Sequence, residues 1–552
     1  MKLAKPLDAY WQSFSFVGLV FAVLFFAASV TPSLLPRPYF VQGLLSGFAL
    51  AFGYAFGVGV VLLYQFLEIR NPSEKVQKIS KAITTVVVAI TVVVFLWQMT
   101  AWQNSIRTLM NLPELETAYP YRMALIAFVT GAVLVGLGRL IILSCRTLAH
   151  RLSLLLPRRV SIVISVILVA FATLLISNRI IARGLLDAAD AFFLRADELI
   201  DDGVEQPASS LAAGSVDSLI DWESIGRQGK NFIAAGPTQE SISEFLGREA
   251  KQPLRVYVGM RSRETPRERA ELALEELKRV GAFDRSILIV ATPTGTGWLD
   301  PGAVDTIEYL HAGDTAIVCT QYSYLPSWIT IIVDPRRSIE SADHLFDTVY
   351  RYWKDLPRDQ RPALYLQGLS LGSLGSEVSA DLYTTFEDPI QGALWSGPPF
   401  PSTQWNDITL HRNPGSPQWL PTYRDGRIVR FTAQQNALES EKPWSPIRNV
   451  YIQYASDPMV FFSPSLLYRK PDWLIGERGP DVSPHLRWYP IVTFLQIAFD
   501  LPLATSIPIG YGHNYSPHHY IDGWIAVTSP QGWDDPTITR LKDKFKPIAA
   551  PE

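Results

Sequence analysis

Residues 363–379 have the sequence ALYLQGLSLGSLGSEVS, and this stretch decides the fold of the second half of the chain. An apolar run leads into the pattern G-x-S-x-G, formed by Gly368, Ser370 and Gly372, and small residues follow in a helical pattern. A sharp turn between a strand and a helix, called a nucleophile elbow, holds a serine in a strained conformation, and the two glycines prevent clashes. The stretch therefore predicts a nucleophilic serine at Ser370. The alternative is a turn rich in glycine and serine that carries no chemistry.

The surrounding sequence alternates short apolar runs with helical patterns. Seven runs read as buried strands: Leu254–Val258, Ser286–Ala291, Thr315–Thr320, Ala363–Gln367, Gly392–Trp395, Ile428–Phe431 and Val450–Tyr454. Helical patterns lie between several of them, as at Thr265–Val280 and Ile339–Lys354. This alternation predicts a mostly parallel sheet with helices on both faces, in which functional residues follow the carboxyl ends of strands.

A nucleophilic serine needs a base, and an acid must hold that base. In a sheet of this kind the acid follows the serine along the chain, and the histidine follows the acid. Asp457 comes just after a predicted strand and is the candidate acid, although Asp-Pro alone also indicates a turn. His513 lies in a glycine-flanked loop and is the candidate base, with His518 and His519 as rivals in the same loop.

The sequence favours chemistry without a cofactor. A zinc site built from the three histidines is an alternative, but no Cys or carboxylate lies at a matching spacing, so we expect no metal. The glycines around Ser370 do not form G-x-G-x-x-G, so dinucleotide binding is not indicated. Only two cysteines are present, Cys145 and Cys319, and they cannot make a disulfide framework.

A serine nucleophile also needs two backbone N–H groups that bind the oxyanion. One is expected from Leu371, directly after the nucleophile. The other is expected from the glycine-rich loop of residues 292–298, which follows the strand Ser286–Ala291, with Thr294 or Gly295 as the donor. A plain turn is the alternative for this loop.

The first third of the chain predicts membrane helices. Five apolar stretches stand out: Phe14–Val30, Leu44–Leu67, Ala82–Leu96, Met123–Leu143 and Val160–Ser177. Each is close to the ~17–25 residues that cross a bilayer, and none contains Asp or Glu, which disfavours an ion pathway. Basic residues gather before the first stretch and in the loops after the second and the fourth: Lys2, Lys5, Arg70, Lys75, Lys78, Lys81, Arg146, Arg151, Arg158 and Arg159. Five spans with these loops in the cytoplasm place everything after Ser177 outside it.

The charges divide the chain in the same way. Residues 1–178 hold 14 basic and 5 acidic side chains, and the remainder holds 35 and 47. An acidic remainder argues against a nucleic-acid partner. We therefore predict a transmembrane domain over 1–178, a juxtamembrane helix and loop over 179–250, and a catalytic domain over 251–552. Apolar residues between the acid and the base, among them Phe461 and Phe462, either line an acyl pocket or form ordinary core.

The sequence resembles the bacterial membrane-anchored α/β-hydrolase family, which has a multi-span N-terminal domain followed by an α/β-hydrolase domain. The resemblance rests on residues 31–37, 293–298, 368–372, 456–458, 478–484, 512–513 and 520–524. It implies that Ser370 is the nucleophile, Asp457 the acid and His513 the base. It implies hydrolase chemistry without naming the molecule that is cleaved.

The leading interpretation is a serine hydrolase of the inner membrane, an esterase or lipase whose active site faces outward and meets membrane lipids or a small acyl ester. Acyltransferases, amidases and peptidases use the same three residues and stay open as alternatives. An alternative of another class is a membrane protein without catalysis that keeps the hydrolase fold as a binding module.

Overall fold

The computed structural model describes residues 13–176, 183–379 and 388–546, and the chain divides into two compact units. The first, which we call the membrane unit, comprises residues 1–186, 462–475 and 480–503. The second, which we call the sheet unit, comprises residues 187–461, 476–479 and 504–552. The second half of the chain therefore contributes to both units.

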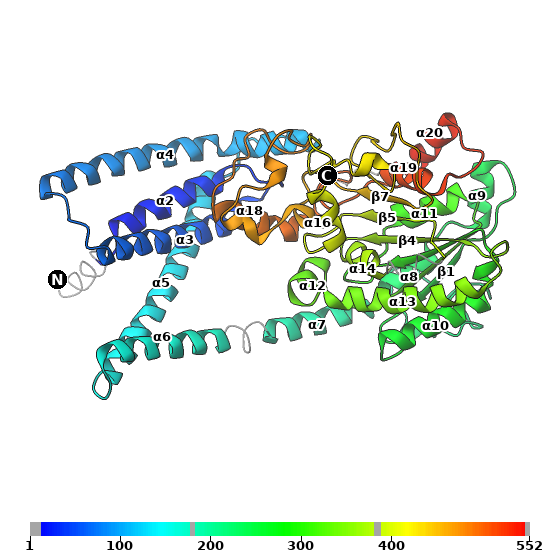
Figure 1. The fold of residues 1–552 in the computed structure, drawn as a ribbon, viewed down its shortest axis with the longest axis horizontal. Coiled ribbons are helices and arrows are strands. Elements are labelled where there is room, and N and C mark those ends of the chain that lie inside the picture. Colours follow the sequence, from blue (N-terminus) through cyan, green and yellow to red (C-terminus); the bar gives the residue numbers. More distant parts are fainter. Residues whose placement is uncertain (1–12, 177–182, 380–387, 547–552) are drawn as a thin grey trace. The chain divides into compact units, whose positions relative to one another are not determined.

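Long apolar helices form most of the membrane unit (Figure 1). They are α2 (Phe16–Val30), α3 (Tyr39–Phe66), α4 (Glu74–Leu109), α5 (Pro120–Leu152) and α6 (Arg158–Leu175). The helices α3 to α6 are long and apolar enough to cross a membrane. Helix α2 has 15 residues, which is below the ~17–25 needed for a crossing. Four of the five predicted stretches thus form helices of spanning length, and the first forms a shorter one.

Helix α2 is short because both its ends are determined locally. The Ser15 side chain accepts a hydrogen bond from the Gly18 N–H and caps the start. At the other end, Thr31 is extended, as expected for a residue that precedes a proline. The helix therefore stops before Pro32.

Glycines of α3 allow close packing within the membrane unit. A Cβ on Gly43 would lie 2.7 Å from the side chain of Ile126 in α5, and a Cβ on Gly53 would lie 2.5 Å from a backbone oxygen of α2. Small residues at such positions let apolar helices approach one another closely. On the outside, α4, α5 and α6 expose bulky apolar side chains such as Val93, Leu140 and Phe171, which suits a lipid environment.

The membrane unit also contains short elements from the second half of the chain. They are η5 (Pro464–Leu467), η6 (Asp472–Leu474), α18 (Val492–Asp500) and η7 (Leu501–Leu503). The predicted division assigned all of residues 251–552 to one catalytic domain. The structure differs because α18 packs on α2 and α3, where Leu495 contacts Leu45 and Ala49 in one apolar cluster.

Seven parallel strands form the sheet unit, in the order β1-β3-β2-β4-β5-β7-β6. They are β1 (Leu254–Val258), β2 (Ile287–Thr292), β3 (Thr315–Thr320), β4 (Ala363–Leu369), β5 (Gly392–Ser396), β6 (Val429–Thr432) and β7 (Arg448–Ile452). All seven predicted strands are present, within two residues at each end. The predicted fold class, an apolar helical region followed by a mostly parallel sheet with helices, is confirmed.

Helices cover both faces of the sheet (Figure 1). The main ones are α10 (Pro266–Arg279), α11 (Pro301–Leu310), α13 (Arg336–Asp355), α14 (Leu371–Ser379), α16 (Thr403–Leu410), α19 (Pro517–Thr528) and α20 (Asp535–Lys544). Leu394 of β5 lies against Gly523 of α19, whereas the next residue, Trp395, donates to Ser376 Oγ of α14 at 2.9 Å. Because neighbouring residues of a strand point to opposite faces, α14 and α19 lie on opposite sides of the sheet.

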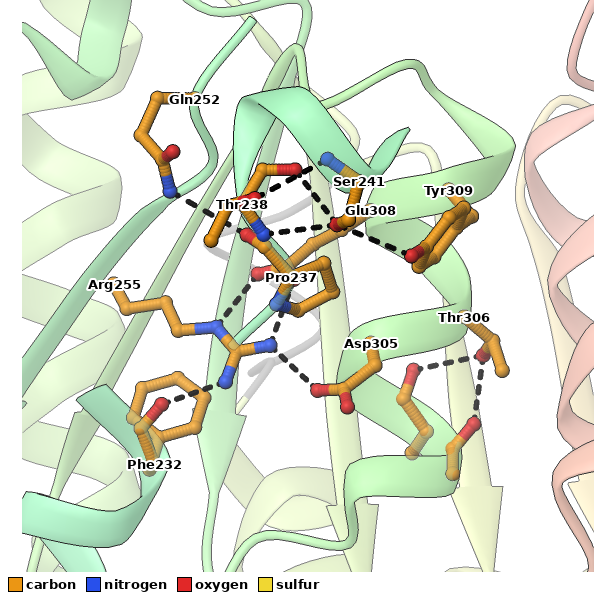
Figure 2. A network of polar contacts seen from close by, with 12 residues as sticks. Phe232, Pro237, Thr238, Ser241, Gln252, Arg255, Asp305, Thr306, Glu308 and Tyr309 are labelled. Carbon is orange, nitrogen blue, oxygen red and sulfur yellow. Dashed lines mark hydrogen bonds and ion pairs between the residues drawn. The ribbon is translucent and has the colours of Figure 1, made fainter. Parts of the chain in front are cut away.

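The predicted linker is largely built into the sheet unit. It contains α7 (Arg183–Asp197), η2 (Trp222–Ser224), α8 (Arg227–Ala234) and α9 (Gln239–Leu246), while residues 179–182 lie outside the described residues. Figure 2 shows how Arg255 of β1 holds this region: its guanidinium donates to the Phe232 carbonyl of α8 at 2.6 Å and to the Glu308 carboxylate of α11 at 2.8 and 2.7 Å. Tyr309 of α11 also donates to Ser241 of α9 at 3.3 Å. Short helices thus stand where a loop was expected.

Candidate active site

Ser370 occupies the turn between β4 and α14. Its φ is +60°, in the left-handed region that a residue with a side chain rarely adopts, and its N–H donates to the Ser396 carbonyl at 3.0 Å. The flanking glycines make the turn possible. A Cβ on Gly368 would lie 2.4 Å from the backbone of Gly372, and a Cβ on Gly372 would lie 2.1 Å from the Thr292 carbonyl oxygen. The predicted strand, sharp turn and helix are therefore present around Ser370, with the backbone strain that an elbow requires.

Asp457 and His513 form a short hydrogen bond. Asp457 lies between β7 and α17 (Pro458–Phe461), and its Oδ2 is 2.6 Å from His513 Nδ1. The Asp457 side chain is fully buried, and its Oδ1 accepts from the Met459 N–H at 2.8 Å. A carboxylate beside Nδ1 keeps the proton on that nitrogen, which leaves Nε2 with its lone pair. Such an imidazole can accept a proton at Nε2.

Ser370 and His513 meet at the end of β5. Ser370 bonds to the carbonyl of Ser396, and the next residue, Gly397, touches the imidazole: a Cβ there would lie 2.5 Å from His513 Cε1. Ser370 Oγ and His513 Nε2 are both buried, and neither has a hydrogen-bond partner within the part of the chain that the structure describes. Catalytic hydrogen bonds are often long before a substrate binds. Ser370 and His513 therefore both lie beside the end of β5, and their reactive atoms are buried without a hydrogen-bond partner among the described residues.

The rival histidines have other partners. They were expected in the loop of His513, but both lie on α19, which begins at Pro517 with Ser516 as its cap. His518 Nε2 is 2.7 Å from the Lys542 carbonyl, and His519 Nδ1 is 2.6 Å from the Tyr454 hydroxyl. Burial lowers the pKa of His519 to about 4. Neither histidine is bonded to Asp457, so the geometry favours His513 as the base.

The loop predicted to complete the oxyanion site lies close to the elbow, since a Cβ on Gly372 would approach both Thr292 and Pro293. Its two candidate donors are already engaged: the Thr294 N–H donates to the Trp298 carbonyl at 2.9 Å, and the Gly295 N–H donates to Ser327 Oγ at 2.9 Å. A serine hydroxyl can rotate away, whereas a loop carbonyl is fixed by the backbone. The role of either amide stays a prediction, as does that of Leu371, the first residue of α14.

Comparison with known families identifies the chain. A family model described as the alpha/beta-hydrolase family matches residues 254–541, and a second, described as the N-terminus of that family, matches residues 30–237. The chain belongs to the alpha/beta-hydrolase family. Searches of curated proteins and of solved structures found no match to it.

Four side chains next to the Ser370 turn and Asp457 were missed from the sequence. The Tyr515 hydroxyl donates to Asp457 Oδ2 at 2.7 Å, two residues after the base. Ser396 Oγ bonds the Tyr520 hydroxyl at 2.8 Å beside the carbonyl that holds Ser370. Glu377 of α14 accepts from Ser373 Oγ at 3.1 Å, and burial raises the pKa of its carboxyl to about 8. Two of them had a signal: Tyr515 lies in the segment Gly510–Tyr515 beside the histidine, and Tyr520 lies in one of the segments that carry the family resemblance.

The two phenylalanines predicted to line an acyl pocket belong to different units of the structure. Phe461 ends α17 in the sheet unit, is buried, and meets the Trp405 ring edge-on at 6.2 Å. Phe462 belongs to the membrane unit and packs on Phe494 at 5.2 Å. Both contacts are ordinary packing, and a pocket role stays a prediction.

A metal centre was not expected. Within residues 13–176, 183–379 and 388–546, no group of three or more His, Cys, Asp or Glu side chains is arranged to hold a metal ion.

Proposed function

We propose that this protein is a membrane-anchored serine hydrolase that cleaves acyl esters, as an esterase or lipase, through Ser370, His513 and Asp457. The observation that carries the proposal is the 2.6 Å bond between Asp457 and His513, with the imidazole against the same end of β5 that holds the strained Ser370. Family membership supports hydrolase chemistry, and the choice of ester over amide substrates is part of the proposal.

The geometry leads to a two-step reaction. Ser370 Oγ attacks the acyl carbon while His513 Nε2 takes the hydroxyl proton, and Asp457 stabilises the imidazolium through Nδ1–H. The negative oxygen is bound by the Leu371 N–H and by a second amide, Thr294 or Gly295. His513 then gives its proton to the leaving alcohol, and an acyl-enzyme remains. Water, activated by His513, releases the acid and restores the serine.

The membrane unit favours the hypothesis that the protein meets its substrate at a bilayer. We propose that the protein resides in the inner membrane with its sheet unit outside the cytoplasm. That orientation follows from the basic loops together with an odd number of crossings, so it requires α2 to cross the membrane along with α3 to α6. A 15-residue helix crosses only if the bilayer thins locally or flanking residues extend it.

The test is covalent labelling of the purified full-length protein in detergent by a fluorophosphonate probe. Wild type should be labelled and Ser370→Ala should not. Ser373→Ala is the matched control, because Ser373 lies on the same helix but bonds to Glu377, and this variant should be labelled like wild type. Equal labelling of Ser370→Ala and wild type would remove the serine mechanism.

A further inference from the structure

The chain leaves the sheet unit between the acid and the base. Asp457 and His513 both belong to the sheet unit, yet residues 462–475 and 480–503, which connect them, belong to the membrane unit. Figure 1 shows α18, from this connecting segment, among the N-terminal helices of its unit. The two residues that must stay in hydrogen-bond contact are therefore joined by a chain segment that is fixed elsewhere.

A buried ion pair anchors the end of this segment. Asp500, the last residue of α18, has its Oδ1 3.6 Å from Arg37 Nε, and both side chains are wholly inaccessible to solvent. Its Oδ2 accepts from the Ser33 hydroxyl and, at 3.4 Å, from the Leu35 N–H. Ser33, Leu35 and Arg37 all lie in the connection between α2 and α3. One carboxylate thus holds α18 against the connection between α2 and α3.

Further hydrogen bonds hold α18 and the connection between α2 and α3 in place. Gln496, one turn before Asp500, donates to the Thr31 carbonyl at 2.9 Å, and the N–H of Arg37 donates to Gln103 of α4 at 3.0 Å. The guanidinium nitrogens of Arg37 have no hydrogen-bond acceptor among the described residues, so Asp500 is the group that balances this buried charge. Well-packed apolar residues often serve stability better than a buried ion pair. We therefore interpret the ion pair as a contact that specifies the location of α18.

The anchored segment continues directly into the backbone that holds the base. Asp500 is followed by η7 and then by Ala504, the first residue back in the sheet unit. The Ala504 carbonyl accepts the N–H of His513 at 2.8 Å. A short stretch of chain thus connects the ion pair to the hydrogen bond that fixes the main chain of the base.

We propose that Arg37 and Asp500 are positioning residues: through α18 and η7 they set the place of Ala504, and through it the place of the His513 imidazole. The membrane unit then forms part of the support of the catalytic base in addition to anchoring the protein. The proposal rests on the proposed function only for its effect on the reaction, because the link from Asp500 to the His513 backbone is structural.

The test compares Asp500→Asn and Arg37→Gln with wild type as full-length proteins in detergent. On an activated ester, kcat should fall about tenfold or more while KM changes little, because a misplaced base slows the chemical step rather than binding. The variants Asp500→Glu and Arg37→Lys, which retain the charges, should recover part of kcat. Ser161→Ala is the matched control: Ser161 is buried in the same unit and its hydroxyl bonds the Leu156 and Pro157 carbonyls at the start of α6, so kcat should stay at the wild-type level.

A second readout does not depend on catalysis. Hydrogen exchange of the amides in residues 504–515 should accelerate in Asp500→Asn and Arg37→Gln and stay unchanged in Ser161→Ala. Unchanged exchange together with unchanged kcat would overturn the proposal. If the neutral variants fail to fold, Ser33→Ala decides it, because this variant removes one donor to Asp500 and keeps both charges. Wild-type kcat together with wild-type exchange in Ser33→Ala would overturn the proposal. If wild type has no esterase activity, the function fails, and the exchange result alone supports or overturns the positioning.

Discussion

Replacing Tyr515 by phenylalanine removes one hydroxyl from the acid of the proposed triad. That hydroxyl donates to Asp457 Oδ2 at 2.7 Å, the same oxygen that faces His513 Nδ1 at 2.6 Å. Burial raises the pKa of the Tyr515 hydroxyl, and the adjacent carboxylate raises it further, so the group stays protonated and donates. The ring itself is retained in the variant, including its stacking on Tyr454 at a centroid distance of 4.6 Å.

The size of the effect follows from the contacts of Asp457. The carboxylate is fully buried and receives hydrogen bonds from Tyr515, from the Met459 N–H and from His513. A hydrogen bond to a charged group contributes about 1.5–3 kcal/mol, so Tyr515→Phe should lower the free energy of unfolding by about that amount. The carboxylate that orients the base also loses one of the donors that hold it in place. We therefore expect kcat to fall about tenfold, with KM nearly unchanged.

Steady-state kinetics on a nitrophenyl ester and chemical denaturation measure the two effects. Tyr454→Phe is the matched control, because its hydroxyl bonds His519 and the Ser516 N–H instead of Asp457. Its kcat should stay within a factor of about three of wild type, as expected for a group outside the catalytic unit. A Tyr515→Phe variant with wild-type kcat, or one whose kcat falls no more than that of Tyr454→Phe, would refute the reasoning.

Three further predictions concern other parts of the chain. Gly397→Ala would place a Cβ 2.5 Å from His513 Cε1 and should lower kcat about a hundredfold. Gly415 also has a positive φ, +88° against +53° for Gly397, but no neighbour within 4 Å, so Gly415→Ala should leave kcat unchanged. Equal kinetics in the two variants would contradict the assigned place of the imidazole. Burial raises the pKa of Glu377 from 4.5 to about 8. Its contribution to stability is therefore fully present below pH 4.5 and is lost as the pH rises through 8. Over this range the free energy of unfolding should fall by up to about 1.4 kcal/mol per pH unit. In denaturation series across this range, Glu377→Gln should flatten the slope, and an unchanged slope would count against a neutral Glu377. A reporter fused after residue 178 should be active outside the cytoplasm, and one fused after residue 155 should be active inside it. Cytoplasmic activity of the first fusion would mean an even number of crossings, which is what α3 to α6 would give if α2 did not cross.

Local patterns in the sequence were enough to predict the sheet and the elbow. Strand runs such as Thr315–Thr320 are continuous apolar segments, and the spacing of Gly368, Ser370 and Gly372 describes a backbone turn that needs no distant partner. The acid and the base were placed by chain order. Asp457 and His513 do form a hydrogen bond, although their catalytic roles stay a prediction.

The features that were missed depend on contacts between distant residues. The apolar residues between acid and base indicated a pocket or core, but nothing local shows that α18 belongs with the N-terminal helices, because that depends on Asp500 meeting Arg37 and Ser33. The hydrogen bond from the Gly295 N–H to the Ser327 hydroxyl likewise cannot be predicted from the spacing of apolar residues. The length of α2 could have been read from Ser15 and Pro32, a cap and a helix breaker that the count of apolar residues ignores.

The most direct test of the central claim is to find which residue a fluorophosphonate modifies. Purified full-length protein is reacted with the probe, digested, and the adduct is located by mass spectrometry. The proposed mechanism predicts a single adduct on Ser370, formed far more slowly in His513→Ala and Asp457→Asn, because the three residues act as one unit. An adduct on another residue, or labelling of Ser370 at an equal rate in wild type and His513→Ala, would contradict it.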